Sequence, residues 1–225
     1  RDGEQVATCV PVRDFAAGGY ILLATRRGEV KKTKLDAYAH IRAGGIQAMD
    51  LEPGDEVISA RRTDGTREVM IATKLGMIIR FAEEEILSKS RGAGGVRGIE
   101  VEDDDAVIAA EVVQEGSQIL TVTERGFGKR TPLEEYRLTG RGGKGIIDIK
   151  TAGRNGTVVG MLQVREGDDI LLVTTKGKVI RIHAGEVSSQ GRNTMGVRII
   201  DLDADDRVGS IARVEAESPA PAEPA

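Results

Sequence analysis

The sequence predicts an all-β protein built as a propeller-like array of four-stranded blades. Four apolar segments recur along its 225 residues, and the glycines that punctuate them, Gly28, Gly76, Gly126 and Gly177, lie 48, 50 and 51 residues apart. A period of about 50 residues is typical of propeller-like arrays. Each segment is rich in β-branched residues and carries its glycine where a tight turn needs a positive φ, so each is predicted to form a β-hairpin.

A second signal supplies the other two strands of each blade. A further glycine, 17 to 19 residues after the first, opens a short apolar stretch at Gly45, Gly95, Gly145 and Gly196. A turn then leads to a last β-branched segment. We interpret the four strands of one repeat as one blade. This gives four complete blades, over residues of about 18–65, 66–115, 116–167 and 168–215.

The two ends of the chain are predicted to differ from the repeats. Val6, Thr8, Val10 and Val12 alternate as in the last strand of a blade, so residues 1–14 are expected to close a blade that is mostly absent. The chain also lacks an initiator Met, and we interpret it as a fragment. Short helical turns are possible near residues 34–39 and 82–87. Residues 216–225 are predicted to be a disordered acidic Pro/Ala tail.

Composition limits the classes of partner. The net charge is −4, but residues 201–225 hold seven acids and two bases, a balance of −5, which leaves +1 for residues 1–200. Aromatic residues are 3% of the chain, too few for a platform on which single-stranded bases stack. No apolar run approaches the roughly 18 residues of a membrane span, so no membrane partner is expected. Cys9 is the single cysteine, which excludes an internal disulfide and favours a cytoplasmic location.

The cations of the body recur at equivalent places in the repeats, which in a radial array would form a belt on one edge. Spaced Lys and Arg with glycine amides between them suit the phosphates of duplex DNA. Alternatively, they are solvated faces of surface hairpins, which we favour for any single hairpin; their agreement over four repeats favours the belt. The hairpins contribute Arg26, Lys31, Lys32, Lys129, Arg130, Lys176, Lys178 and Arg181, and the loops Arg42, Lys89, Arg91, Arg97, Arg137, Arg141, Lys144, Arg192 and Arg198.

The glycine-rich stretch at 140–145 has the spacing of a nucleotide motif. With Gly142, Gly143 and Gly145 it satisfies G-x-G-x-x-G, but that motif follows a strand and opens a helix, whereas here a loop precedes and a strand-like run follows. The two histidines, His40 and His183, stand in unrelated phases of the repeat, and no nucleophile, base or metal set recurs. A free-standing enzyme is therefore the weakest class, and no cofactor or metal is expected.

Two motifs carry a family resemblance. Residues 126–137 read Gly-Phe-Gly-Lys-Arg-Thr-Pro-Leu-Glu-Glu-Tyr-Arg, and residues 141–145 read Arg-Gly-Gly-Lys-Gly. With the repeats, they resemble the C-terminal domain of bacterial DNA gyrase A, over residues 1 to about 215. The family's box is Gln-Arg-Arg-Gly-Gly-Lys-Gly; Thr139 and Gly140 replace its first two residues. Since the family carries the full box in its first blade, we interpret this copy as a degenerate one in a later blade.

The resemblance implies a β-pinwheel, usually of six blades, whose basic rim wraps duplex DNA and so directs strand passage toward negative supercoiling. The implied partners are double-stranded DNA, the remainder of gyrase A and the gyrase B protein, in the bacterial cytoplasm with the nucleoid. DNA cleavage and ATP hydrolysis by this type IIA topoisomerase would reside outside the fragment. The alternatives are the corresponding C-terminal domain of topoisomerase IV and a propeller-like protein-interaction module.

Overall fold

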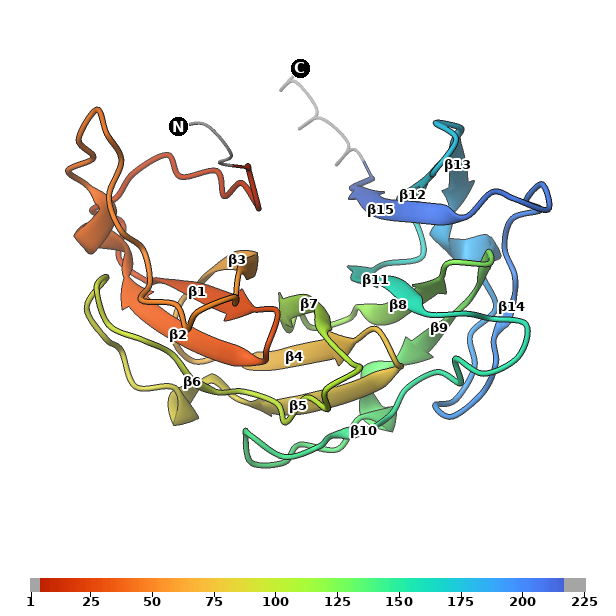
Figure 1. The fold of residues 1–225 in the computed structure, drawn as a ribbon, viewed down its shortest axis with the longest axis horizontal. Helices are drawn as coiled ribbons and strands as arrows, with labels where there is room; N and C mark the ends of the chain where they lie inside the picture. The colour runs from red at the N-terminus through yellow and green to blue at the C-terminus, as the bar shows by residue number, and fades with distance from the viewer. Residues whose placement is uncertain (1–4, 217–225) are drawn as a thin grey trace, which may run out of the picture.

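The computed structural model describes residues 5–216 as antiparallel sheets arranged side by side in an arc (Figure 1). This confirms the all-β, propeller-like fold. The strands are β1 (Tyr20–Thr25), β2 (Glu29–Lys34), β3 (Val57–Thr63), β4 (Glu68–Thr73), β5 (Met77–Ala82), β6 (Val96–Arg97), β7 (Val107–Val112), β8 (Gln118–Thr123), β9 (Phe127–Pro132), β10 (Ile146–Ile147), β11 (Val158–Val164), β12 (Asp169–Thr174), β13 (Val179–His183), β14 (Val197–Arg198) and β15 (Val208–Val214).

The predicted hairpins are confirmed as β1–β2, β4–β5, β8–β9 and β12–β13. Their turns contain the repeat glycines. Gly76 shows why glycine is needed, because its φ is +86° and a Cβ there would lie 2.3 Å from the carbonyl oxygen of Ile149. A third strand, β3, β7, β11 or β15, pairs antiparallel with the first strand of each hairpin.

The fourth strand of a sheet comes from the following repeat. β6 pairs with β2, β10 with β5, and β14 with β9, while among the described residues the last sheet has only β13, β12 and β15. The prediction that one repeat supplies all four strands of a blade is therefore wrong. The reason is the path of the chain: the N–H of Lys89 bonds to the carbonyl of Lys32, which lays the segment before β6 on the open edge of β2. A strand of two residues can form its backbone hydrogen bonds with any free sheet edge that the chain brings next to it.

The predicted leading strand is not formed. Residues 5–14 contain no strand; Val10 and Val12 instead pack against the apolar cluster of the first sheet. The apolar stretch at 46–51 is also not a strand. Neither segment pairs with a strand within the described residues, and an unpaired strand lacks its backbone hydrogen bonds. The predicted tail lies outside the described residues except for Ala216.

Helical structure is limited to short 3₁₀ turns across the part of the chain that the structure describes. They are η1 (Leu35–Tyr38), η2 (Glu83–Glu85), η3 (Leu133–Glu135) and η4 (Ala184–Glu186), and the first two confirm the turns expected from sequence. Across residues 5–216, no helix has the length and apolar character to cross a membrane.

The apolar core lies between neighbouring sheets. Leu22 and Val30 of the first repeat pack with Ile71 and Ile79 of the second, each at most 2% exposed. Later clusters likewise combine the second repeat with the third and the third with the fourth. Full burial of such a side chain contributes about 1.5–3 kcal/mol. Each repeat is therefore stabilised mainly by its neighbours.

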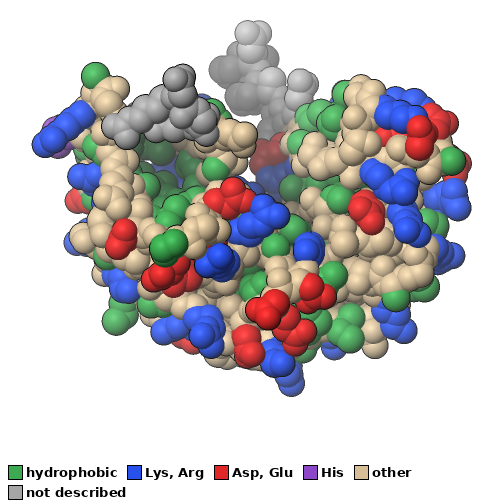
Figure 2. Space-filling model, in the orientation of Figure 1, with side chains coloured by type: hydrophobic (Ala, Val, Ile, Leu, Met, Phe, Trp, Pro, Cys, Tyr) green, Lys and Arg blue, Asp and Glu red, His purple; other side chains and the backbone are tan. Residues whose placement is uncertain are grey.

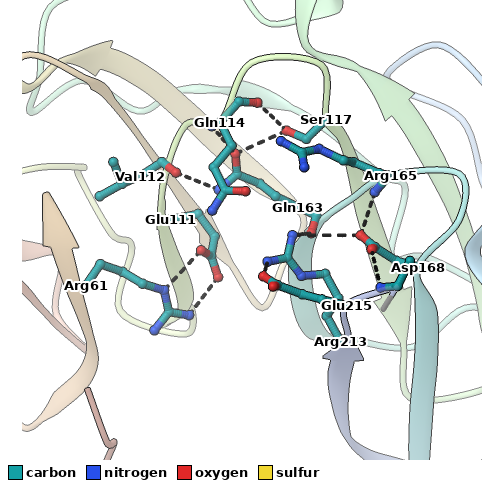
Figure 3. A network of polar contacts seen from close by, with 11 residues as sticks. Arg61, Glu111, Val112, Gln114, Ser117, Gln163, Arg165, Asp168, Arg213 and Glu215 are labelled. Atoms are coloured by element: carbon teal, nitrogen blue, oxygen red, sulfur yellow. Dashed lines mark hydrogen bonds and ion pairs between the residues drawn. The ribbon is translucent and has the colours of Figure 1, made fainter. Parts of the chain in front are cut away.

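Polar side chains join the third strands, which contact one another in the order β3, β7, β11, β15. In Figure 3, Arg61 donates from Nε and Nη2 to both carboxylate oxygens of Glu111, at 3.0 and 2.6 Å. The buried amide of Gln163 donates to the Val112 carbonyl at 2.7 Å, and Arg213 donates to the Gln163 carbonyl at 3.0 Å. Such bridges fix the strands of adjacent sheets relative to one another.

Candidate nucleic-acid interface

The candidate interface consists of the segments that run from each 3₁₀ turn to the second glycine of the repeat. We call these the rim loops; they are residues 39–45, 86–95, 136–145 and 187–196. The last three lie on the preceding sheet, because the N–H groups of Lys89, Thr139 and Gln190 bond at 2.8–2.9 Å to carbonyls of its second hairpin strand. They continue into β6, β10 and β14 on the outer side of the arc (Figure 1).

Three predicted DNA-binding lysines are buried. Lys31, Lys32 and Lys129 are 1%, 5% and 0% exposed. Their ammonium groups donate to backbone carbonyls under the rim loops and the 3₁₀ turns, for example from Lys32 to the Glu83 carbonyl at 3.1 Å. A side chain so enclosed cannot touch a DNA phosphate. The expectation of direct phosphate contact is therefore corrected for these three residues.

The environment of Lys129 is a buried polar cluster. Its ammonium lies 3.6 Å from Oδ1 of Asp148. The same oxygen accepts a hydrogen bond of 2.7 Å from the hydroxyl group of Tyr136. The second carboxylate oxygen accepts from Thr121 at 2.6 Å. Burial lowers the pKa of Lys129, although the nearby carboxylate of Asp148 acts in the opposite direction and raises it. Burial and the negative charge of Asp148 raise the pKa of Tyr136.

The arginines of the rim loops hold the preceding repeat. Arg141 donates from Nε and Nη1 to the carbonyl oxygens of Glu85 and Arg97, at 3.1 and 3.0 Å. Arg192 makes the equivalent two bonds one repeat later, at 2.7 and 3.0 Å, and Arg91 makes a single one at 3.2 Å. A guanidinium has five N–H donors, so these half-buried arginines keep donors available after binding the carbonyls.

Hairpin arginines make the opposite link, to the following repeat. Arg130 donates to the carbonyls of Val187 and Gly185 at 2.8 and 3.1 Å. Arg80, at the same position of the previous repeat, donates to carbonyls around η3. Half-buried Lys89 donates to two carbonyls of its own loop, at 3.2 and 3.3 Å. The structure therefore gives these cations contacts within the array.

Other predicted site cations are exposed and form surface ion pairs. An exposed pair of this kind is worth about 0–1 kcal/mol, so a phosphate could replace the carboxylate at little cost. The exposed pairs are Arg26–Glu56, Lys144–Glu102, Lys176–Asp205, Lys178–Asp203 and Arg198–Asp201. Arg181 is also exposed, but its partner Asp169 has a side chain that is only 12% exposed.

Arg42, Arg97 and Arg137 are exposed, and their guanidinium groups make no hydrogen bond or ion pair to any residue in the range 5–216. They belong to the first, second and third repeats, in or directly after the rim loops. In the view of Figure 2, Lys and Arg side chains are spread along the margin of the molecule, with acidic side chains among them. These three arginines are the predicted site cations that are most open to an external anion.

The glycine-rich rim loop of the third repeat is shaped by its glycines. Gly145 has φ +75°, and a Cβ there would lie 2.4 Å from the Ile78 carbonyl oxygen. Gly142, with φ +80°, donates to the Gly98 carbonyl at 2.6 Å, and the Gly143 carbonyl accepts from Glu100 at 2.9 Å. The segment leads into strand β10 and not into a helix, which confirms that it is not a dinucleotide-binding turn.

Sequence reasoning missed a polar hollow of about 790 Å³ beside the third strands β3 and β7, lined in part by Arg62, Arg67 and Arg165. We call it the inner hollow. Arg62 in β3 corresponds to Val112 in β7, Gln163 in β11 and Arg213 in β15, so arginine occupies this position only in the first and last of the four repeats. The signal available was the Arg61–Arg62 pair at the end of a predicted strand.

Solved structures and curated proteins resemble this chain. The solved C-terminal domain of DNA topoisomerase IV matches it with TM-score 0.88 and 28% identity, over 96% of this chain and 68% of that one. A solved DNA gyrase A C-terminal domain matches with TM-score 0.81 and 28% identity, over 90% and 68%. The DNA gyrase A protein of Halalkalibacterium halodurans is 48% identical over 95% of this chain and 26% of the relative.

The chain spans about a quarter of the length of the curated gyrase relatives that it matches. The family described as "DNA gyrase C-terminal domain, beta-propeller" matches residues 19–64, 67–114, 117–165 and 168–215. These matches cover most of the chain and confirm the resemblance inferred from its motifs. The chain belongs to the DNA gyrase C-terminal domain, beta-propeller, family.

Proposed function

We propose that this chain binds duplex DNA without sequence specificity and bends it along the rim loops, as the wrapping domain of a bacterial DNA gyrase. The observation that carries the proposal is the set of Arg42, Arg97 and Arg137, exposed and unpaired among residues 5–216, on three successive repeats. Contacts spaced along an arc hold a duplex by its phosphates, whatever its sequence. The exposed ion-paired cations, Lys144 among them, extend the same surface.

The free energy needed to bend the duplex is modest. Bending 20–30 base pairs by 40–90° costs about 1–6 kcal/mol. Several phosphate contacts that release counterions supply free energy of this order at low salt. The arginine and strand-exchange links between repeats keep the rim loops at fixed spacing, so little of the binding free energy is lost in ordering the protein.

In the proposed assembly the partners are the remainder of gyrase A and the gyrase B protein, in the cytoplasm with the nucleoid DNA. Wrapping would present the DNA so that strand passage introduces negative supercoils. Gyrase is favoured over topoisomerase IV because curated relatives at 37 to 48% identity over about nine-tenths of this chain are gyrase A proteins; the solved gyrase and topoisomerase IV domains do not separate the two, since each is 28% identical. A full-length gyrase carrying this domain should add negative supercoils; relaxation without supercoiling would favour topoisomerase IV.

The direct test is the salt dependence of duplex binding. The triple variant R42Q/R97Q/R137Q should reduce the slope of log K against log[salt] by up to about 2.7, since each neutralised phosphate contributes roughly 0.9. A matched control, R62Q/R67Q/R165Q, removes three arginines that line the inner hollow and should leave the slope nearly unchanged. A wild-type slope near zero, or equal effects of the two triple variants, would refute the proposal.

A further inference from the structure

Two buried lysines occupy the same position in alternate repeats and bind the rim loop of the next repeat. Lys31 in β2 pairs with Leu23, and Lys129 in β9 pairs with Thr121, at equivalent places in their hairpins. The corresponding residues of the second and fourth repeats are Ile79 and a second isoleucine, Ile180. The lysine therefore distinguishes the loops at 86–95 and 187–196 from the glycine-rich loop at 136–145, which lies over Ile79.

The ammonium groups are enclosed by carbonyl oxygens. Lys31 donates to the carbonyls of Arg91, Ala93 and Ala48, the last two at 2.9 and 2.8 Å. Lys129 donates to the carbonyl of Gly191 at 2.8 Å and to that of Asp148 at 2.8 Å. Both side chains are at most 1% exposed. Each lysine thus draws peptide carbonyls of the overlying loop toward the protein interior.

The orientation of a carbonyl fixes that of the neighbouring amide. In a planar trans peptide, the C=O and the N–H point in opposite directions. When the carbonyls of Arg91, Ala93 and Gly191 point inward, the N–H groups of the residues that follow them point away from the interior. These residues are Gly92, Gly94 and Arg192, and within residues 5–216 none of their N–H groups donates a hydrogen bond.

Backbone N–H groups that point away from the interior and lie next to cationic side chains are suited to binding anions. Backbone N–H groups without a partner in the protein can donate to phosphate oxygens of a duplex. Gly92 lies beside Arg91, whose guanidinium is held by the Gln47 carbonyl, and Gly92 has open space where a Cβ would stand. The buried ammonium adds a positive charge directly beneath the same peptides.

We propose that Lys31 and Lys129 are positioning residues for DNA binding, which turn the amides of Gly92, Gly94 and Arg192 toward the phosphate oxygens of the duplex. The inference rests on the function proposed above and extends it. The backbone of two rim loops, and not only their side chains, contacts DNA. The lysines take part without touching the DNA.

The first experiment needs no substitution. A short duplex is titrated into the ¹⁵N-labelled chain, and the amide resonances are followed at two salt concentrations. The resonances of Gly92, Gly94 and Arg192 should shift on binding, and the shifts should weaken at high salt. If the duplex binds with a steep salt slope while these resonances stay unchanged, this inference is wrong and the proposed function stands. If the duplex does not bind, the proposed function fails.

The second experiment compares K31M with K34M. Both remove a single positive charge from β2, but Lys31 is buried and Lys34 is exposed. K31M should weaken duplex binding about tenfold, which corresponds to about 1.4 kcal/mol. It should abolish the shift of Gly92 and leave that of Arg192, and it should only reduce the shift of Gly94, because the Ala93 carbonyl also accepts from the Asp50 N–H at 3.1 Å. K34M should retain these shifts and bind more tightly than K31M. Equal loss of affinity in both variants, with the shifts retained, would show that only the charge matters and would overturn the inference.

Discussion

Tyr136 and Asp148 are joined by a hydrogen bond of 2.7 Å in which both side chains are 1% exposed. Asp148 also accepts from Thr121 and lies 3.6 Å from the ammonium of Lys129, so two hydrogen-bond donors and one positive charge surround this carboxylate in the interior of the third repeat. A buried charge is tolerated only when its hydrogen bonds are satisfied. The stability of this repeat therefore depends on every member of the cluster.

The first prediction is that Y136F lowers the free energy of unfolding by about 1–3 kcal/mol, because it leaves a buried carboxylate oxygen without its donor. The measurement is urea denaturation at neutral pH. The control is Y20F, since the Tyr20 hydroxyl makes no hydrogen bond among residues 5–216, and its unfolding free energy should change by less than about 0.5 kcal/mol. Equal effects of the two changes would contradict the assignment.

The second prediction concerns alkaline pH. The pKa of Tyr136 is raised in the folded protein by burial and by Asp148, so the folded state keeps the phenolic proton after the unfolded state has released it. Tyr136 therefore contributes stability that is fully present below a pH of about 10 and is lost above it, by at most about 1.4 kcal/mol per pH unit. The difference in unfolding free energy between wild type and Y136F should fall over this range. If the difference in unfolding free energy between wild type and Y136F stays constant from neutral pH to a pH of about 11, the prediction is refuted.

The third prediction separates two glycines of one rim loop. G145A should destabilise by about 2–4 kcal/mol, from a strained φ of about 1–2 kcal/mol and a contact that the backbone must shift to relieve. That contact is the 2.4 Å approach to the Ile78 carbonyl. Gly143 has no positive φ, and its added Cβ would meet its nearest atom only at 4.0 Å. G143A should therefore change the midpoint of thermal unfolding very little, and a large loss in G143A would show that the loop is packed differently.

The fourth prediction separates structural from binding cations. R141A removes two hydrogen bonds to carbonyls of the preceding repeat and should lower the unfolding free energy by about 1.5–3 kcal/mol. K144A removes only an exposed ion pair with Glu102 and should alter it by less than about 0.5 kcal/mol. Both should weaken duplex binding. Denaturation and duplex binding are measured on each variant; a loss of stability in K144A equal to that in R141A would contradict this division.

Much of the fold could be predicted from local pattern. The hairpins follow from β-branched runs around Gly28, Gly76, Gly126 and Gly177, because a tight turn with positive φ leaves little conformational alternative. The short 3₁₀ turns at 35–38 and 83–85 were also expected. The exchange of the fourth strand could not be predicted, since a two-residue strand such as β6 carries no information about which edge it will join.

The candidate site was predictable only in part. The repeat period places Arg91, Arg141 and Arg192 at equivalent positions, but it does not reveal that their side chains donate to backbone carbonyls of the preceding repeat. Lys31 and Lys129 look like surface cations in the sequence, where neighbours distant along the chain are not visible. Their burial arises from loops about 60 residues away, at Ala93 and Gly191.

The sequence by itself determined the repeat, the hairpins, the family and the concentration of cations in equivalent loops, because these depend on composition and on spacing along one repeat. The tertiary structure alone decided which cations are buried and which edge each short strand joins. It also decided which arginines stay open to an external anion. These properties depend on contacts between repeats, whose energies come from desolvation and hydrogen bonding across distances in sequence that no local pattern encodes.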